Sequence, residues 1–432
     1  MKKSIYPTTE IWSELLQRPT QTIADIEATV NQIFSEVKNK GNMAVSKYTQ
    51  LFDGIAISDT LVSSEEIESA GVEVSKKLKQ AIHLAKNNIE KFHKAQQSGP
   101  IHVETMEGVH CWQEKRPIEK VGLYIPGGSA PLFSTILMLA VPAALAGCKE
   151  VFLCTPPGEN GSIHPAILYT AQLCGVDQIY KIGGIQAIAA MTFGTETIPK
   201  AHKLFGPGNQ FVTVAKQIAT KFGVAIDMPA GPSELMIFAD DTANAAFVAS
   251  DLLSQAEHGA DSQVILVTTS QKMLNAVETQ IALQICDIPR QDIAQKAMES
   301  SKLVLVNNEE EALAIINEYG PEHLIIVAEN ESLFIEGVRN AGSIFIGSYT
   351  PESAGDYASG TNHTLPTNGY AKQYSGVNLD SFLKSMTFQK ISKKGIQNIG
   401  KAVELMAQSE GLIAHKNAVS LRLIAIENEE KI

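Results

Sequence analysis

From Val121 onward the sequence alternates short apolar runs rich in β-branched residues with longer segments of helical character. This alternation is typical of parallel α/β architecture, in which each strand is followed by a helix that returns the chain to the sheet. The first array of apolar runs covers residues 121–125, 151–154, 178–182 and 202–205. A second array covers residues 233–240, 262–269, 302–308, 323–328 and 342–347. We therefore predict two Rossmann-like parallel sheets.

The Pro/Gly turn at residues 227–232 lies between the two arrays and indicates a boundary near Gly231. The first hundred residues are expected to be mainly helical, with one apolar stripe at helical spacing: Ile23, Ile26, Val30 and Ile33. We expect an N-terminal arm, a discontinuous first Rossmann-like domain, a second such domain and a helical C-terminal tail. Their respective bounds are 1–22, 23–123 together with 235–378, 124–234, and 379–432.

The tail contains two helical stripes of apolar residues, separated by a break at Gly411. Two short helices without a sheet cannot bury such stripes by themselves. They are therefore expected to dock either on their own domain or on a partner subunit.

Composition limits the classes of partner. The chain has 432 residues, a net charge of −12, 44% hydrophobic residues and 19% charged residues, as in an ordinary globular protein. This negative charge argues against nucleic-acid and anionic-membrane partners, which need clustered Lys and Arg. The apolar stretch at residues 132–147 contains Pro142 and is shorter than the roughly 20 residues that span a bilayer, so we expect a buried helix. No apolar run follows the N-terminal lysines as in a secretory signal, so the cytoplasm is the expected location.

The five cysteines include no Cys-x-x-Cys pair, which fits neither a disulfide framework nor a thiolate zinc site. We expect them to be reduced residues of the core. The alternative is that Cys148 or Cys154 is a nucleophile that traps an aldehyde as a thiohemiacetal.

Gln255 and His258 are three residues apart in a predicted helix, so their side chains share one face. Gly259 is a natural helix stop, which places His258 near a helix end. The pair is a candidate for metal ligation. A lone histidine near a helix terminus can equally be a capping or surface residue.

Glu322 and His323 directly precede a predicted strand, and Pro321 restricts the approach of the chain. A loop at a strand end is where α/β sheets place catalytic groups. A carboxylate can activate water, and an imidazole can move protons near neutral pH. The alternative interpretation is an exposed polar turn.

Residues 348–367 form a long polar segment of small residues between apolar elements, which is typical of a functional loop. Asp356 is a candidate ligand in this segment, whereas for His363 we favour a structural hydrogen bond within the loop. Glu410 and His415 lie five residues apart across the break between the two tail helices, and this spacing alone assigns them no role.

Nucleotide-binding signals are indirect. The sequence has no phosphate-binding P-loop motif, and GPGNQF at residues 206–211 lacks the third glycine of the dinucleotide fingerprint. However, glycine turns follow three predicted strands of the first array, at residues 126–131, 183–184 and 206–208. Such turns can present backbone N–H groups to an anion, although glycines at tight turns are also common without a ligand.

Seven segments, in order, resemble the histidinol dehydrogenase family: GLYIPGGSAPLFST, FGPGN, DMPAGPSE, DLLSQAEHG, YGPEHL, PESAGDYASGTNHTLPT and AHKNAV. The likeness runs from about Ile23 to Leu421, and several of the motifs are long and peculiar to that family. Ile185 departs from the family pattern, since a small residue is expected before Gln186.

The resemblance implies roles for individual residues. It implies a zinc ion bound by Gln255, His258, Asp356 and His415. It implies NAD contacts from Tyr124, Gln186 and Asn209. Substrate contacts are implied for these four zinc ligands and for Ser233, His323 and Glu410. Glu322 and His323 correspond to the catalytic acid/base pair. The family is a homodimer with a swapped tail, so Glu410 and His415 would enter the neighbour's site.

The implied activity is the NAD-dependent four-electron oxidation of L-histidinol through L-histidinaldehyde to L-histidine, the last steps of histidine biosynthesis. His323 would take the hydroxyl proton as a hydride passes to NAD, and Glu322 would activate water for the second oxidation. Ligands of this kind would also accept Mn²⁺ or Co²⁺. Two rival hypotheses are a metal-dependent hydrolase, which needs no nucleotide fold, and a sensor that binds histidinol or histidine without turnover.

Overall fold

The computed structural model describes residues 1–19, 23–56, 59–127 and 130–430. The chain divides into two compact units. The first unit comprises Met1–Gln96 and Ile118–Phe382, and the second comprises Gln97–Pro117 and Leu383–Ile432. Each unit has its own sheet architecture.

The first unit contains a six-stranded parallel sheet in the order β1-β11-β10-β9-β12-β13. These strands are β1 (Lys2–Ile5), β9 (Glu234–Ala239), β10 (Gln263–Thr268), β11 (Lys302–Leu305), β12 (His323–Val327) and β13 (Ser343–Ile346). Alternate residues of β9 enter different cores: Leu235 and Ile237 join one hydrophobic cluster, and Met236 and Phe238 join another. Because both faces are covered, the strands are almost continuously apolar.

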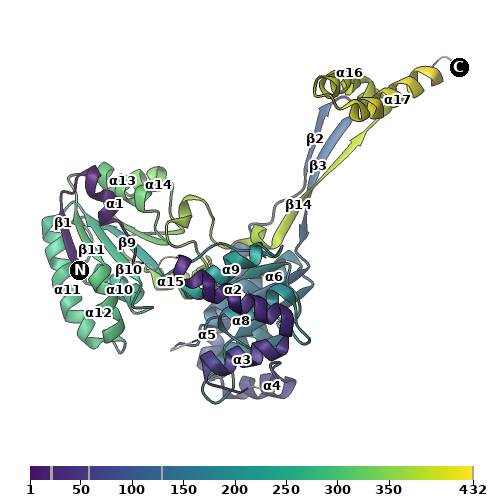
Figure 1. Cartoon of the computed structure of the whole chain (residues 1–432). Coiled ribbons are helices and arrows are strands. Elements are labelled where there is room, and N and C mark those ends of the chain that lie inside the picture. The colour runs from purple at the N-terminus through teal and green to yellow at the C-terminus, as the bar shows by residue number, and fades with distance from the viewer. Residues whose placement is uncertain (20–22, 57–58, 128–129, 431–432) are drawn as a thin grey trace. The chain divides into compact units, whose positions relative to one another are not determined.

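Helices cover both faces of this sheet (Figure 1). Residues of α10 (Ala245–Ala256), α11 (Gln271–Gln284) and α12 (Gln291–Ser300) pack in the first cluster. Residues of α13 (Glu309–Tyr319) and α14 (Glu331–Gly337), together with partly buried residues of α1 (Trp12–Leu15), pack in the second. The short helix α15 (Glu352–Tyr357) follows β13.

The first unit also contains a five-stranded parallel sheet in the order β6-β5-β4-β7-β8. Its strands are β4 (Lys120–Tyr124), β5 (Glu150–Thr155), β6 (Gln178–Lys181), β7 (Lys203–Phe205) and β8 (Ala225–Ile226). The prediction of two parallel sheets is therefore confirmed.

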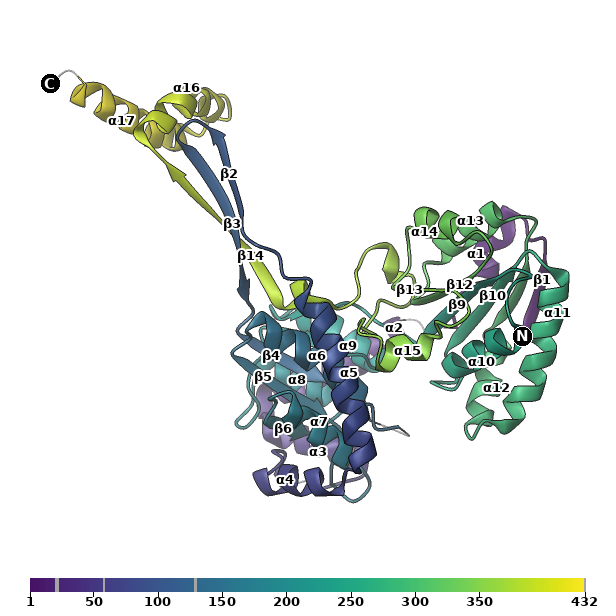
Figure 2. The ribbon, with the colours of Figure 1, turned by 180° about the vertical axis from the view of Figure 1, so that it is seen from behind.

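One face of the five-stranded sheet packs against α2 (Ile23–Lys40), α3 (Asn42–Asp53), α8 (Gly184–Phe193) and α9 (Gln210–Thr220). The other face packs against α4 (Ser64–Glu73), α6 (Phe133–Ala146) and α7 (Pro165–Leu173), and α5 (Lys76–Lys94) packs on α6. Figures 1 and 2 show these two faces in turn.

These contacts assign some N-terminal segments to a different sheet from the one expected from the sequence. Residues 23–123 were expected to belong with 235–378, but α2 packs on α8 and α9 of the five-stranded sheet, and β4 is a strand of that sheet. The expected arm contributes β1 to the six-stranded sheet. An apolar pattern predicts that a helix is buried, but not which sheet it covers. The side chain of Ile23 lies outside the described residues, whereas Ile26, Val30 and Ile33 are buried as predicted.

The apolar stretch that includes Pro142 forms helix α6 and is almost entirely buried, as predicted. Among the described residues, no helix is long and apolar enough to cross a membrane.

The second unit is an antiparallel ribbon of β2 (Ile101–Met106), β3 (Val109–Pro117) and β14 (Leu383–Ile391), followed by α16 (Lys393–Ser409) and α17 (Ile413–Glu429). The predicted break at Gly411 is confirmed, with a left-handed φ of 76°. The expected C-terminal helices are present, but they begin at Lys393 and not at residue 379, because β14 precedes them. Most side chains of β14 are exposed, so this strand lacks the apolar run or clean alternation that marks a buried one.

Candidate active site

A pocket of about 1310 Å³ lies in the first unit. Residues of both parallel sheets line it. On the five-stranded sheet the lining residues follow the carboxyl ends of strands, as with Tyr124 at the end of β4 and Asn209 after β7. On the six-stranded sheet they precede the amino ends of strands, as with Ser233 before β9 and Glu322 before β12.

Glu322 and His323 are placed by the turn between α13 and β12. Helix α13 ends at Gly320 in a left-handed conformation (φ 62°), and Pro321 leads into the strand. Both side chains line the pocket, although Glu322 is only 6% exposed and His323 only 3%. This burial excludes the alternative of an exposed polar turn.

The Glu322 carboxylate is held by one backbone contact. The N–H of Glu234 donates to its Oε2 at 2.9 Å, and the Nδ1 atom of His323 lies 3.7 Å from the same oxygen. Burial raises the pKa of Glu322 to about 8, against the opposing effect of the nearby His323. This carboxyl group therefore titrates close to neutral pH, as suits a general acid or base.

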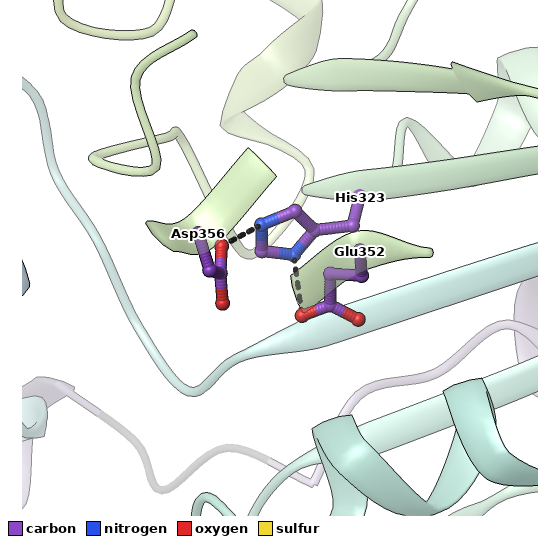
Figure 3. A group of neighbouring side chains, drawn as sticks. All are labelled: His323, Glu352 and Asp356. Atoms are coloured by element: carbon purple, nitrogen blue, oxygen red, sulfur yellow. Dashed lines mark ion pairs between the residues drawn. The ribbon is translucent and has the colours of Figure 1, made fainter. Parts of the chain in front are cut away.

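His323 lies between two further carboxylates, which both belong to α15 (Figure 3). Its Nδ1 is 3.5 Å from Oε1 of Glu352, and its Nε2 is 3.6 Å from Oδ1 of Asp356. Burial lowers the pKa of His323, but Glu352 and Glu322 favour the charged imidazolium, so the pKa is raised well above its ordinary value. Burial opposes ionisation of Asp356, but its contact with His323 lowers the pKa of this carboxyl group.

His323, Glu352 and Asp356 form a group whose ligand atoms lie close enough to bind one metal ion. Within the described chain, Nε2 of His323 and Oδ1 of Asp356 are buried and have no hydrogen-bond partner. Glu352 was not among the residues predicted from the sequence. Its signal is the spacing of four residues from Asp356, which places both carboxylates on one helical face.

His258 and Gln255 lie near the C-terminal end of α10, as predicted. His258 lines the pocket, and burial lowers the pKa of its imidazole. Gln255 is fully buried and is not among the described residues that line the pocket. With its amide oriented so that the nitrogen faces Glu352, it donates to Oε2 of that carboxylate at 3.0 Å.

The polar segment at residues 348–367 forms α15 and an ordered loop. The expectation for His363 is confirmed, because its Nδ1 lies 2.8 Å from the backbone oxygen of Asp356. Its Nε2 lies 3.0 Å from the hydroxyl of Thr135 on α6. His363 thus ties the helix that carries Asp356 to an element of the five-stranded sheet.

The three residues that the resemblance assigns to NAD line the same pocket. The Tyr124 hydroxyl accepts a hydrogen bond from the N–H of Gly184 at 3.1 Å, and Asn209 caps α9 by accepting from the N–H of Val212. Gln186 is fully buried, and neither polar atom of its amide has a partner in the described chain. Ile185 also lines the pocket. Of the glycine turn at residues 126–131, Gly128 and Ser129 lie outside the described residues.

The remaining predicted residues fall in two places. Ser233 lines the pocket, whereas Glu410 and His415 are exposed residues of the second unit and are not among its described lining residues. No cysteine is among the described lining residues, and all five cysteines are free thiols. Burial raises the pKa of Cys148 to about 11 and that of Cys154 still further, so neither is an activated nucleophile.

Comparisons with known proteins agree along almost the whole chain. The family model described as histidinol dehydrogenase matches residues 16–423. The histidinol dehydrogenase of Bacteroides thetaiotaomicron is 58% identical, covering 98% of this chain and 99% of the relative. That of Escherichia coli (strain K12) is 50% identical over 98% of this chain and 97% of the relative. The crystal structure of histidinol dehydrogenase from Elizabethkingia anophelis has a TM-score of 0.96 and 57% identity, covering 99% of each chain. This chain therefore belongs to the histidinol dehydrogenase family.

Proposed function

We propose that the pocket of the first unit is the active site in which Glu322 and His323 carry out the proton transfers of the family reaction. That reaction is the NAD-dependent oxidation of histidinol to histidine. The observation that carries this proposal is the burial of both ionisable groups in the pocket that the unpaired Gln186 amide also lines. A volume of about 1310 Å³ exceeds the roughly 300–1,000 Å³ of a single-ligand pocket, so it suits a substrate together with a nucleotide.

His323 serves as the base for the alcohol. Its Nδ1 faces the backbone oxygen of Glu234 at 3.2 Å, and its Nε2 has no hydrogen-bond partner in the described chain. In the deprotonated ring, a proton on Nδ1 leaves the lone pair of Nε2 available for the substrate hydroxyl. Because the neighbouring carboxylates raise the pKa of His323, the fraction of this basic form increases with pH. Glu352 and Asp356 stabilise the imidazolium that forms after proton transfer, because both carboxylates lie within 4 Å of the ring.

Glu322 serves as the base for the second oxidation. When ionised, it takes a proton from the water that adds to the aldehyde carbon. The resulting hydrate transfers its carbon-bound hydrogen as a hydride to a second NAD and becomes the carboxylate product. Each turnover thus removes four electrons from histidinol and reduces two molecules of NAD.

The side chains that could ligate a metal here offer nitrogen and oxygen atoms, which suit a divalent metal ion. Asp356 presents a buried carboxylate oxygen without a hydrogen-bond partner, and burial favours the neutral, metal-binding form of His258. With the amide nitrogen of Gln255 oriented toward Glu352, the amide oxygen is the atom available as a ligand. We propose that these three residues and His415 of the partner subunit hold Zn²⁺. When bound, the ion would orient and polarise the alcohol as a Lewis acid.

Tyr124, Gln186 and Asn209 are proposed to contact NAD. Gln186 supports this assignment most directly, because a fully buried amide without a partner costs free energy unless a ligand satisfies it. Ser233 is proposed to contact histidinol, as are the metal ligands and His323.

The proposed oligomer is a homodimer in which Glu410 and His415 complete the site of the neighbouring subunit. Both are exposed at the junction of α16 and α17, where four large apolar side chains are exposed as well: Leu405, Met406, Leu412 and Ile413. Such a cluster is typical of a protein interface. The cytoplasm stays the expected location.

An assay of purified protein with histidinol and NAD tests the function. We expect absorbance at the wavelength of reduced nicotinamide to increase, with two molecules of NAD reduced for each histidine formed. A hydrolase would consume its substrate without this absorbance change. A sensor would bind histidinol without turnover, and either result would refute the proposal.

A further inference from the structure

Glu234, the first residue of β9, contacts both proposed catalytic residues through its backbone. Its N–H donates to the Glu322 carboxylate at 2.9 Å, and its carbonyl oxygen lies 3.2 Å from Nδ1 of His323. The N–H of Glu234 is the one hydrogen-bond donor recorded for the Glu322 carboxylate within the described chain. The position of residue 234 therefore sets the position of this carboxylate.

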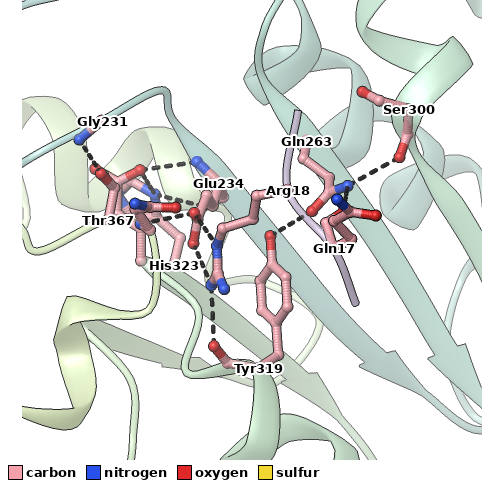
Figure 4. Close-up of polar contacts among 11 residues, drawn as sticks. Gln17, Arg18, Gly231, Glu234, Gln263, Ser300, Tyr319, His323 and Thr367 are labelled. Atoms are coloured by element: carbon pink, nitrogen blue, oxygen red, sulfur yellow. Dashed lines mark hydrogen bonds and ion pairs between the residues drawn. The ribbon is translucent and has the colours of Figure 1, made fainter. Parts of the chain in front are cut away.

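The side chain of Glu234 holds that position. Its carboxylate is 3% exposed and is bound in a bidentate manner by Arg18, with Nε at 2.5 Å from Oε1 and Nη2 at 2.9 Å from Oε2 (Figure 4). The backbone N–H of Asn368 donates to Oε1 at 2.7 Å. A bidentate pair of this kind fixes both the distance and the plane of a carboxylate.

Arg18 is itself fixed by its surroundings. Its guanidinium lies 3.8 Å from the centre of the Tyr319 ring, and its Nη2 donates to the backbone oxygen of Tyr319 at 2.9 Å. The Tyr319 hydroxyl donates to Oε1 of Gln263 at 2.8 Å, and the amide of Gln263 donates to the backbone oxygens of Ser300 and Gln17. The guanidinium plane is therefore set by stacking as well as by hydrogen bonds, and a lysine could not reproduce it.

We propose that Arg18 and Glu234 are positioning residues for Glu322. Arg18 fixes the Glu234 carboxylate, and the backbone N–H of Glu234 then places the Glu322 carboxylate toward the pocket. This inference rests on the role proposed for Glu322 as the base for the second oxidation. It adds a residue from the N-terminal segment, 304 positions before Glu322, to the set on which the reaction depends.

A double-mutant cycle separates positioning from a purely structural role. Arg18→Lys keeps the charge but loses the bidentate geometry. We expect kcat for histidinaldehyde oxidation to fall about 10- to 100-fold in the parent enzyme, as misplacement of a catalytic group does. In a Glu322→Gln background the same substitution should change kcat less than about 2-fold, because the carboxylate to be positioned is gone. The KM for histidinaldehyde should remain unchanged in both backgrounds.

Lys181→Gln is the matched control. Lys181 pairs with Glu66 at 2.6 Å and its side chain is 12% exposed, against 15% for Arg18, but no described contact joins this pair to Glu322. Its effect on kcat should be the same in both backgrounds. Thermal unfolding followed by circular dichroism checks that each variant folds.

If Arg18→Lys fails to fold, the double variant Arg18→Met with Glu234→Gln replaces it in the cycle, because it removes both buried charges together. The inference is overturned if the Arg18 substitution lowers kcat equally in both backgrounds, or leaves kcat unchanged in the parent enzyme. A Glu322→Gln enzyme with full aldehyde oxidation would instead refute the role of Glu322, and with it this inference. The two failures are therefore distinguishable.

Discussion

Replacing Glu322 with glutamine tests the base proposed for the second oxidation. The amide has nearly the same shape, and its oxygen can still accept the hydrogen bond from the Glu234 N–H, but it is not a useful base. We expect histidinaldehyde oxidation to fall by about 10²-fold or more, the usual contribution of general-base catalysis, with little change in substrate binding. Stopped-flow measurement of NAD reduction with the aldehyde supplied directly gives this rate.

The structure also predicts how this loss depends on pH. The pKa of Glu322 is raised to about 8, so about a tenth of the carboxyl groups are ionised at pH 7 and about nine-tenths at pH 9. Only the ionised form is a base. Aldehyde oxidation by the parent enzyme should therefore rise about tenfold from pH 7 to pH 9, and the variant should lack this rise.

The reasoning about Glu322 would be refuted by unchanged aldehyde oxidation in the glutamine variant. A variant that loses activity but keeps the parent's pH dependence would assign the titration to another group. Binding of histidinol, measured by isothermal titration calorimetry, is the control for an indirect effect on substrate affinity.

Three further predictions concern the metal, the nucleotide and the tail. His258→Ala should lose the metal proposed to bind there, while its unfolding temperature stays near that of the parent. Elemental analysis decides this, and full occupancy with full activity would refute the ligand assignment. Gln186→Ala should raise the KM for NAD about 3- to 10-fold, the loss of one or two hydrogen bonds, with kcat less affected; an unchanged KM would remove Gln186 from the nucleotide site. Co-expressed Glu322→Gln and His415→Ala chains should recover about a quarter of the parent activity, because half of randomly paired dimers are mixed and each mixed dimer has one intact site. Proven mixed dimers that are as inactive as either parent would rule out a shared tail.

The parallel sheets could be predicted because their strands are covered on both faces. Burial on two faces requires continuous apolar runs such as those of β9 and β10, and these runs are visible in the sequence. The ribbon of the second unit gave no comparable signal. In β2 all six side chains are exposed, so neither an apolar run nor an alternation with a buried face marks it as a strand.

The candidate site could be predicted in part, because some of its chemistry is local in sequence. Glu322 and His323 are neighbours, and Gln255 and His258 lie three residues apart at the C-terminal end of α10. Arg18 and Glu234 could not be found in this way, because their pairing depends on a tertiary contact between segments 216 residues apart. Nothing in the sequence near Arg18 distinguishes it from an exposed arginine.

The pocket is bordered by carboxyl ends of strands on one side and by amino ends of strands on the other. This difference in strand direction predicts which amino-acid substitutions each side can accept. On the five-stranded sheet, substitutions are limited by the backbone conformation and by close backbone contacts. Any side chain at Gly206, whose φ is 132°, would collide with the carbonyl group of Tyr124, and one at Gly208 would collide with Val212. On the six-stranded sheet, substitutions are limited by the need for the ionisable groups of Glu322 and His323. In a saturation-mutagenesis library selected for growth without histidine, the five-stranded side, which is proposed to bind the nucleotide, should therefore be depleted mainly at glycine codons. The six-stranded side, which is proposed to carry the catalytic residues, should be depleted at codons for ionisable residues.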